Sequence, residues 1–464
     1  MQREKKKFID KGLLFAIFTL AWPTMLEELM QTAVQYIDTA MVGSLGTDAV
    51  AAVGSTTTVN WVIITTLSAL GIGFLSFISR SLGAGNSELA RKASAQAVTA
   101  VIVSGVLFTV LTVSLSSYIP IWMQVDVHIQ DMAARYFLIL YSPMLPRAAT
   151  IIFGTVLRSA GDSKTPMRVG VLMNIINVIL NFFLIYPTRT VQILSKEFSL
   201  FGAGFGIEGA ALASAVAFTV GGVYMTVAIW RHPVISPKGY SLKPDFQILA
   251  PCMKVATPNM LQRFTTSLGY VAFASMINSL GEISTAAHTI ANTVESAFYI
   301  PGYGMQAAAA TLAGNAIGAK DQRRLKSLAR LIISIEASLM IVSGTLLFVF
   351  APWMMSLFTF DAQVIVLGAT VLRMVAVSEP FYGVSIVIEG MLQGVGKTMV
   401  PFVFNIIGMW GIRIIGTFIC IRFFDMGLVS AWACMIVHNL MLFASFLVYW
   451  LKGRWNPLKK DAVS

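Results

Sequence analysis

Long hydrophobic segments separated by short polar ones run along the whole chain. A helix of about 20 apolar residues is long enough to cross the ~30 Å hydrocarbon core of a bilayer. Twelve segments meet this length, at 13–40, 50–80, 92–118, 132–157, 166–187, 206–230, 248–277, 284–314, 328–350, 364–392, 400–421 and 427–450. The pattern therefore predicts an all-α polytopic membrane protein with twelve transmembrane helices.

The two halves of the sequence also resemble each other when they are aligned at one constant spacing, at which Pro23 corresponds to Pro258. Other pairs that coincide at this spacing are Ser44 and Ser279, Gly83 and Gly318, Leu157 and Leu392, and Gly161 and Gly396. The last helix pair matches at a shorter spacing instead, where Gly206 meets Gly427 and Ala210 meets Ala431. The first half therefore carries an insertion near 187–204.

The duplication predicts two six-helix lobes, at 1–235 and 247–464, joined by a cytoplasmic linker at 236–246. Six is an even number, so both lobes enter the membrane with the same orientation and the repeat is parallel. Two similar halves of this kind suit a transporter, because they can rock about a site between them.

Lysine and arginine are distributed very unevenly between the two sides of the predicted membrane protein. With the N-terminus inside, 24 of them fall on the inner side and three, Arg189, Lys196 and Arg422, on the outer side. This asymmetry follows the positive-inside rule and predicts a multi-pass protein of the cell (cytoplasmic or inner) membrane with both termini in the cytoplasm. The net charge of +11 is thereby explained by topology, so we expect no nucleic-acid partner.

The composition argues against an enzyme. The chain is 56% hydrophobic and 12% charged, with a mean hydropathy of +0.75. Its loops are too short for an enzyme domain, and it has no Walker loop, zinc motif or Gly-x-Ser-x-Gly. The three cysteines, Cys252, Cys420 and Cys434, show no paired spacing that would indicate a disulfide framework or a metal site. We expect no cofactor other than a coupling ion.

The first helix has one polar side, and Asp38 lies near its outer end. A carboxylate inside a membrane helix costs about 2.5–3.5 kcal/mol on insertion scales, so it usually has a partner or a task. Asn177 and Asn181 share one side of the fifth helix and offer amide groups to it. We interpret the three residues as a site for a coupling ion, either H⁺ or Na⁺ bound at Asp38. The alternative is that the asparagines only hydrogen-bond helices together.

Polar stripes on other helices mark candidates for a substrate site. The first helix contributes Gln31 and Gln35. In the second half the candidates are His288, Asn292, Glu295 and Tyr299 on the eighth helix, and Glu379 and Tyr382 on the tenth. A carboxylate beside an aromatic ring suits an organic cation, although a lone histidine is more often just hydrogen-bonded. For Arg373 and Arg413, which lie within predicted helices, we expect internal salt bridges.

Several short motifs, in this order and spacing, resemble those of multidrug and toxic compound extrusion (MATE) transporters. The first is Trp22-Pro23 followed by Gln31 and by Asp-Thr-Ala-Met-Val-Gly at 38–43. The others are Gly83-Ala84-Gly85, Leu-Arg-Ser-Ala-Gly-Asp at 157–162, Pro301 with Gly304, and Gly-Asn-Ala-Ile-Gly-Ala at 314–319. The resemblance covers nearly the whole chain, and it points to the bacterial and archaeal members of the multidrug/oligosaccharidyl-lipid/polysaccharide flippase superfamily.

The resemblance implies a V-shaped fold and a secondary active antiporter that exports organic cations and lipophilic drugs in exchange for inward Na⁺ or H⁺. Asp38 matches the aspartate that members of the family use for coupling, and Asn177 and Asn181 match the two positions that accompany it. In some proton-coupled members the second position is an aspartate, which this chain lacks. In the NorM-type subgroup an acidic pair stands where this chain has Thr266 and Tyr382, so a site of that type is not expected here.

The sequence leaves three other classes of protein as alternatives. A lipid or lipid-linked-saccharide flippase of the same superfamily would usually have more helices. A major facilitator transporter would usually carry Gly-x-x-x-Asp-Arg after the second helix, where this chain has Gly-Ala-Gly-Asn-Ser-Glu at 83–88. A membrane-embedded enzyme would need convergent catalytic groups, and no nucleophile–base pair stands out. The leading interpretation is a monomeric drug exporter.

Overall fold

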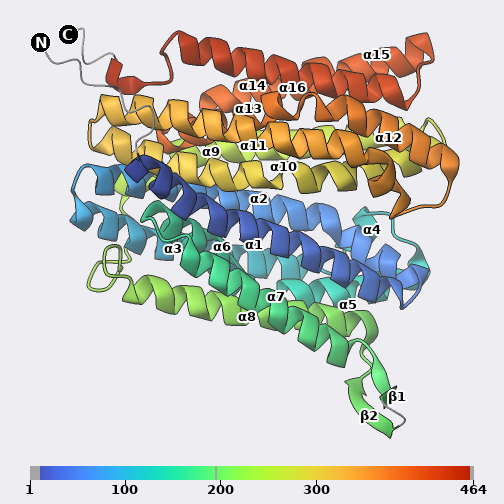
Figure 1. Ribbon diagram of the computed structural model, residues 1–464. Helices are drawn as coiled ribbons and strands as arrows, with labels where there is room; N and C mark the ends of the chain where they lie inside the picture. The colour runs from blue at the N-terminus through green and yellow to red at the C-terminus, as the bar shows by residue number, and fades with distance from the viewer. Residues whose placement is uncertain (1–10, 194–195, 460–464) are drawn as a thin grey trace, which may run out of the picture. The chain divides into compact units, whose positions relative to one another are not determined.

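The computed structural model describes residues 11–193 and 196–459, and almost all of them are helical (Figure 1). The first half contains α1 (Lys11–Gly43), α2 (Thr47–Gly83), α3 (Ser87–Leu115), α4 (Ile119–Trp122), η1 (Val127–Ile129), α5 (Gln130–Tyr141), α6 (Met144–Ser159), α7 (Lys164–Leu184) and α8 (Gly206–Arg231). The second half contains α9 (Phe246–Asn278), α10 (Glu282–Gly318), α11 (Gln322–Ser356), α12 (Ala362–Ala376), α13 (Glu379–Gly394), α14 (Met399–Ile406), the π-helix η2 (Ile407–Ile414), α15 (Ile415–Phe424), α16 (Leu428–Leu451) and η3 (Pro457–Lys459).

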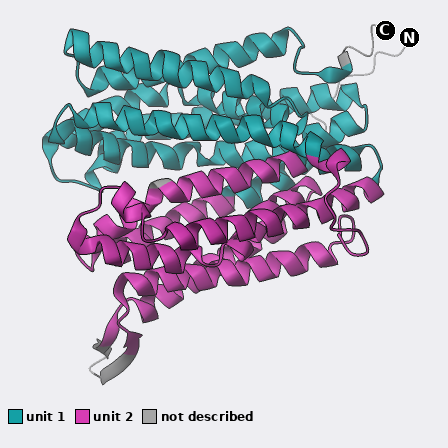
Figure 2. Cartoon of the chain, turned by 180° about the vertical axis from the view of Figure 1, so that it is seen from behind, with its two compact units in different colours: residues 1–25, 75–86, 250–464 teal, residues 26–74, 87–249 magenta. Residues whose placement is uncertain are grey.

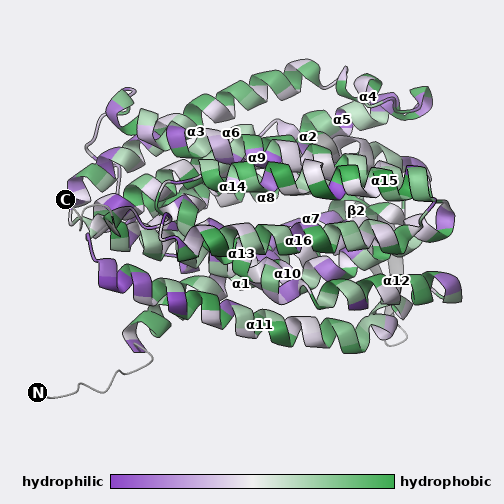
Figure 3. Cartoon of the chain, turned by 90° about the horizontal axis from the view of Figure 1, so that it is seen from above, coloured by the Kyte–Doolittle hydropathy of each residue, from purple (hydrophilic) through white to green (hydrophobic). Residues whose placement is uncertain are grey.

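The helices confirm the predicted class, an all-α polytopic membrane protein. Among the described residues, eight helices are long and apolar enough to cross a membrane, and ten when each of two bent pairs counts as one span. The remaining two predicted segments, 248–277 and 284–314, fall within α9 and α10. Most residues along helices such as α11 and α15 are hydrophobic (Figure 3). Many of them are exposed, including Val103 and Val110 on α3, which suits contact with lipid.

Two segments that the sequence predicts as continuous helices are broken. The segment 132–157 divides into α5 and α6 with a bend of 52°, and 364–392 divides into α12 and α13 with a bend of 55°. Proline accounts for both breaks, because it lacks an N–H group and disfavours helical backbone in the residue before it. Pro143 lies at the first break, and Pro380 is the second residue of α13. The breaks fall at equivalent positions of the duplication.

The predicted insertion near 187–204 forms a β-hairpin, the one pair of strands in the described chain. Strand β1 (Pro187–Ile193) pairs antiparallel with β2 (Lys196–Ala203). Pro187 lies opposite Ala203, and a bulge interrupts the pairing next to Pro187. The hairpin ends directly before α8, at the outer end of the helices by the predicted topology.

The structure groups into two compact units (Figure 2). Unit 1 contains residues 1–25, 75–86 and 250–464, and unit 2 contains residues 26–74 and 87–249. Helices α1 and α2 therefore contribute to both units. The lobe boundaries at 235 and 247 stay a prediction.

Within unit 2, the segment around the predicted linker is attached to α3. The Gln96 side chain donates to the Lys243 carbonyl at 2.9 Å and accepts from the Asp245 backbone N–H at 3.0 Å. One turn away, the Thr99 hydroxyl donates to the Leu242 carbonyl at 2.7 Å. Buried or partly buried side chains on α3 thus satisfy backbone groups of a segment that has no regular structure.

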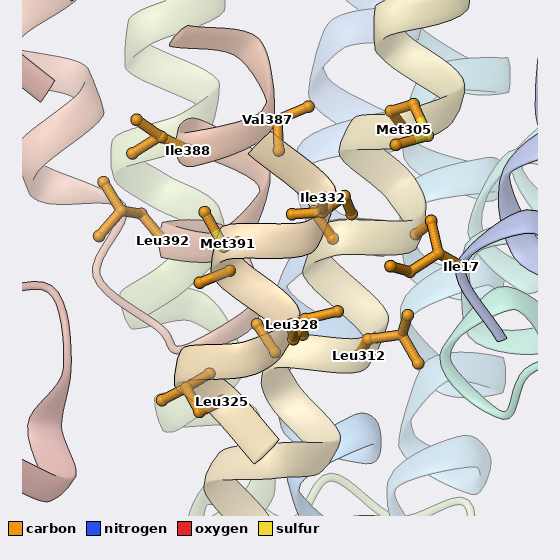
Figure 4. Close-up of a cluster of buried hydrophobic side chains, with 14 of the residues drawn as sticks. Ile17, Met305, Leu312, Leu325, Leu328, Ile332, Val387, Ile388, Met391 and Leu392 are labelled. Atoms are coloured by element: carbon orange, nitrogen blue, oxygen red, sulfur yellow. The ribbon is translucent and has the colours of Figure 1, made fainter. Parts of the chain in front are cut away.

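The interior of unit 1 is built from apolar residues of α1, α10, α11 and α13 (Figure 4). Ile332 on α11, Val387 on α13 and Ala309 on α10 are completely buried. A second apolar cluster joins α9, α10, α11, α12 and α16 around Phe273 and Trp432. Burial of such side chains stabilises each by about 1.5–3 kcal/mol relative to exposure, so these clusters hold the unit together.

Helices α2 and α10 cross within unit 1 through a reciprocal contact of two glycines. A Cβ atom on Gly83 would lie 2.1 Å from the Asn315 carbonyl oxygen, and one on Gly318 would lie 1.9 Å from the Arg80 carbonyl oxygen. Both pairs, Gly83 with Gly318 and Arg80 with Asn315, are equivalent positions of the duplication. The two helices can approach this closely only because neither glycine has a side chain.

We predict that Gly318→Ala destabilises the protein by about 1–3 kcal/mol, because the added methyl group would press on a backbone carbonyl that cannot rotate away. Thermal unfolding of the purified protein in detergent measures the effect. Gly54→Ala on α2 is the matched control, since a Cβ atom there would have no neighbour within 4 Å. Equal unfolding temperatures for both variants would contradict the packing described here.

Candidate functional site

The three residues predicted to bind the coupling ion come together in unit 2. Asn181 on α7 donates its amide N–H to the Asp38 carboxylate on α1, with 2.6 Å between Nδ2 and Oδ1. The same amide nitrogen lies 3.1 Å from Oδ1 of Asn177, one turn earlier on α7. All three residues thus lie together on facing sides of α1 and α7, and their role in binding a coupling ion stays a prediction.

The structure adds a fourth member that sequence reasoning missed. Asn177 donates to the hydroxyl group of Ser214 on α8 at 2.9 Å, so the hydrogen bonds run from α1 through α7 to α8. Ser214 stands among small apolar residues, and no periodic polar stripe marks it in the sequence. A single serine in such a helix gives no signal until its neighbour is known.

The arrangement offers oxygen atoms that could bind a cation. Asn177 and Asn181 are buried, and the Oδ1 atom of Asn181 has no hydrogen-bond partner. Asp38 is half-buried, and Tyr136 on α5 is close enough to interact with it electrostatically. Carboxylate and amide oxygens are the ligands that hard cations such as Na⁺ prefer, and a carboxylate can instead take a proton. The chemistry of the donor set fits either ion.

Another acidic residue of α1 has a structural role. Glu27 forms a salt bridge with Arg158 on α6, at 2.5 Å between Oε2 and the guanidinium. Gly170 on α7 leaves space for the Glu27 side chain, because a Cβ atom there would lie 3.2 Å from it. Gln31 and Gln35, predicted for the substrate site, are exposed on α1.

In unit 1 the predicted stripes of α10 and α13 face each other. The ring of Tyr299 lies edge-on to the rings of Tyr303 and Tyr382, with centroids 5.8 and 5.9 Å apart. Glu295 and Glu379 are buried, and the two carboxyl groups interact electrostatically. Asn292 is exposed. The structure therefore brings most of the second-half candidates together, and their role in substrate binding stays a prediction.

His288 packs between aromatic rings. Its imidazole lies edge-on to Phe273 at 5.7 Å and to Trp432 at 5.8 Å, and its Nδ1 atom has no hydrogen-bond partner. The surroundings are those of a core residue rather than of a polar binding site.

The expected salt bridges of Arg373 and Arg413 do not form among the described residues. Arg413 lies over the rings of Phe273 and Tyr270, at 4.8 and 5.2 Å from their centroids. Arg373 donates to the Phe348 carbonyl at 3.3 Å. The prediction was wrong because an aromatic face or a free carbonyl also satisfies a guanidinium, and helical periodicity cannot show which one lies opposite.

Two of the three cysteines are neighbours, although their spacing gave no hint of it. The sulfur atoms of Cys420 on α15 and Cys434 on α16 lie 3.9 Å apart, and all three cysteines are free. The described residues contain no group of three or more His, Cys, Asp or Glu placed to hold a metal ion.

Comparison with known proteins decides the family. The family model MatE matches the chain twice, over residues 23–183 and 258–419. The two matches begin at Pro23 and Pro258, the same pair of residues that coincides in the duplication of the sequence. The chain belongs to the MatE family. Its members are transporters rather than enzymes, which confirms the resemblance noted above.

Relatives of this MatE protein cover nearly its whole length. The probable multidrug resistance protein NorM of Thermotoga maritima is 27% identical over 441 residues, which is 95% of this chain and 92% of that protein. The mouse multidrug and toxin extrusion protein 2 is 25% identical over 473 residues, which is 96% of this chain and 76% of that protein.

Solved structures show the same fold. A multidrug resistance MATE family transporter in an outward-facing conformation superposes with a TM-score of 0.88 at 23% identity, over 99% of this chain and all of that one. A MATE transporter in a bent conformation gives a TM-score of 0.87 at 23% identity, over 98% of this chain and all of that one.

We predict that Asn181→Ala destabilises the protein by about 1–3 kcal/mol, because it leaves the Asp38 carboxylate and Asn177 without their shared donor. Ser214→Ala, at the far end of the hydrogen-bonded chain, should cost about 0.5–1.5 kcal/mol. Thermal unfolding of the two purified variants measures the difference. A larger loss for Ser214→Ala would show that the chain is not organised around Asp38.

Proposed function

We propose that this protein is a secondary active multidrug exporter that expels organic cations and lipophilic drugs in exchange for inward Na⁺ or H⁺. The observation that carries the proposal is the hydrogen-bonded chain from Asp38 to Ser214, in a protein of the MatE family. Relatives named for multidrug resistance support the substrate class.

The coupling step follows from the chemistry of Asp38. Binding of a proton or Na⁺ removes an uncompensated negative charge that α1 would otherwise hold inside the protein. A change of charge at the contact between α1 and α7 shifts the balance between conformations only as far as the ion binds one of them more tightly. The unpartnered Oδ1 atom of Asn181 is the nearest further ligand for such an ion.

The location proposed for the exporter is the cell membrane, with both termini in the cytoplasm. The apolar helices support a multi-pass membrane protein, and the distribution of Lys and Arg supports the orientation. Drug-like small molecules are the proposed substrates, and the protein is proposed to work as a monomer.

We predict that Asp38→Asn abolishes ion-driven export, reducing it to the level of protein-free liposomes. Asparagine keeps the size of the side chain and its contact with Asn181, so insertion and folding should survive while the ionisable group is lost. Drug efflux from liposomes under an imposed pH or Na⁺ gradient is the measurement. Normal gradient-driven export by the purified variant would refute the role of Asp38.

We also predict that Glu295→Gln weakens the binding of cationic drugs by about tenfold, the equivalent of ~1.4 kcal/mol, and of neutral drugs much less. The carboxylate stands on the same stripe of α10 as Tyr299, and its charge attracts only cations. Binding titrations with matched cationic and neutral compounds measure the difference.

Glu389→Gln on α13 is the matched control for this test. The Glu389 carboxylate accepts hydrogen bonds from Gln262 at 3.0 Å, Gln393 at 3.2 Å and Asn405 at 3.3 Å. These amide groups already occupy the carboxylate, so it is not available to bind a drug. We expect this variant to keep its preference for cations. An equal loss of both drug classes in Glu295→Gln would assign Glu295 to packing.

A further inference from the structure

A third carboxyl group of unit 1, that of Glu336, takes no part in the sites described so far. Glu336 lies well inside α11. At 1.5 Å per residue it is about 21 Å along the helix from the first residue, Gln322. The residue is 0% exposed. Neither of its two carboxyl oxygens has a hydrogen-bond partner, and no described Lys, Arg or His forms a salt bridge with it. Such a group in the middle of a membrane helix needs an explanation.

Two glycines form the space that holds this carboxyl group. A Cβ atom on Gly302 of α10 would lie 2.9 Å from Glu336 Oε1, and one on Gly383 of α13 would lie 2.8 Å from the same oxygen. The other side chains that a Cβ atom on these two glycines would meet, Met340 and Ile386, are apolar. The carboxyl group therefore occupies a niche between α10 and α13 that any larger residue at either glycine would fill.

The niche lies close to the break between α12 and α13. Glu379, the first residue of α13, is 1% exposed and has one unpartnered carboxyl oxygen. It interacts electrostatically with Glu336 from α11 and with Glu295 from α10. Gly344 lets α11 approach this break, because a Cβ atom there would lie 2.6 Å from the Ala376 carbonyl oxygen and 3.4 Å from Glu379.

Positive charge from the surrounding elements does not reach Glu336. Arg413 of the π-helix interacts with Glu295 and lies over aromatic rings. Arg373 of α12 is exposed and bonded to a backbone carbonyl. An isolated carboxylate in an apolar interior is costly by several kcal/mol, and neighbouring carboxylates add to the cost. Glu336 must therefore be neutralised by something that the neighbouring side chains do not supply.

A proton fits this niche better than a metal ion. Hard metal cations take several oxygen ligands, and the described residues contain no group of three or more His, Cys, Asp or Glu placed to bind a metal. Besides Glu336 itself, the side chains that lie against the two glycines of the niche are Met340 and Ile386, which offer no oxygen ligand. A proton needs only the carboxyl group itself.

We propose that Glu336 is a proton-binding residue of this transporter, protonated while α10, α11 and α13 pack around it and deprotonated when that packing opens. This proposal rests on the ion-driven export proposed above, and it names the proton as one of the coupled ions. Release of the proton requires water at the niche, and the break between α12 and α13 is the place where the packing can change without breaking a helix. Glu379, next to this break, links the charge state of Glu336 to α13 through the electrostatic interaction of the two carboxyl groups.

Infrared difference spectroscopy of the reconstituted protein tests the protonation directly and needs no drug. We expect the C=O stretch of a protonated carboxyl group in the wild type near neutral pH and the loss of this component in Glu336→Gln. Glu389→Gln, which removes another carboxyl group from α13, should keep the Glu336 component. Should Glu336→Gln fail to fold, Glu336→Asp should shift the component instead of removing it.

Two results of this experiment would overturn the proposal. An unchanged band in both Glu336 variants would show that Glu336 is not protonated. Loss of the wild-type band on addition of Na⁺ at constant pH would show that Na⁺ displaces the proton, so that the niche does not select a proton over a metal ion.

Drug affinity as a function of pH tests the coupling. Protonation linked to the transport conformations should change the drug affinity of the wild type by about fivefold or more between acidic and alkaline pH, and Glu336→Gln should reduce that change. An undiminished pH dependence in Glu336→Gln would overturn the coupling role. Absence of export by the wild type would instead refute the proposed function, and the infrared result would still decide whether Glu336 holds a proton.

Discussion

A carboxyl group inside a membrane protein has to be neutralised, because hydrocarbon and packed apolar side chains offer it neither water nor a compensating charge. This protein meets the requirement in three different ways. Glu27 pairs with Arg158, Glu389 accepts hydrogen bonds from three amide groups, and Asp38 shares one amide donor with a neighbouring asparagine. Where the protein neutralises a carboxyl group less completely, a mobile cation has to contribute more. Asp38 and Glu336 are the carboxyl groups that the protein neutralises least.

Close packing by glycine determines where such groups can be placed. Helices α2 and α10 touch through Gly83 and Gly318, where each glycine faces a carbonyl group of the other helix. The same device at Gly302 and Gly383 does not bring two backbones together but leaves a space that the Glu336 carboxyl group fills. Glycines therefore have two different roles in this protein, close helix contact and space for a side chain. Only the atom that faces the glycine distinguishes the two roles.

Much of the fold follows from the sequence for simple physical reasons. Apolar length predicts the helices, and the match of Pro23 to Pro258 predicts the duplication. Helical periodicity places Asp38 and Asn181 on polar faces, and the resemblance to MATE transporters pairs them. Periodicity gives the face of a helix but not what lies opposite, so the aromatic partners of Arg413 and the link to Ser214 could not be predicted. Glu336 was detectable as a carboxylate inside an apolar segment, but it belongs to no stripe.

The duplication conserves backbone contacts and not charges. At the equivalent spacing Asp38 corresponds to Phe273, and Glu336 corresponds to the buried Val101. Where two helices cross at a pair of glycines, both residues must stay small for either helix to keep its position. A carboxyl group requires only that its own surroundings neutralise it, so each half can gain or lose one without disturbing the other half. Asp38 and Glu336 lie in different units, on α1 and α11, and the contacts described for each come from its own unit. The two sites can therefore differ in the ion they take, because the surroundings that select the ion are not shared.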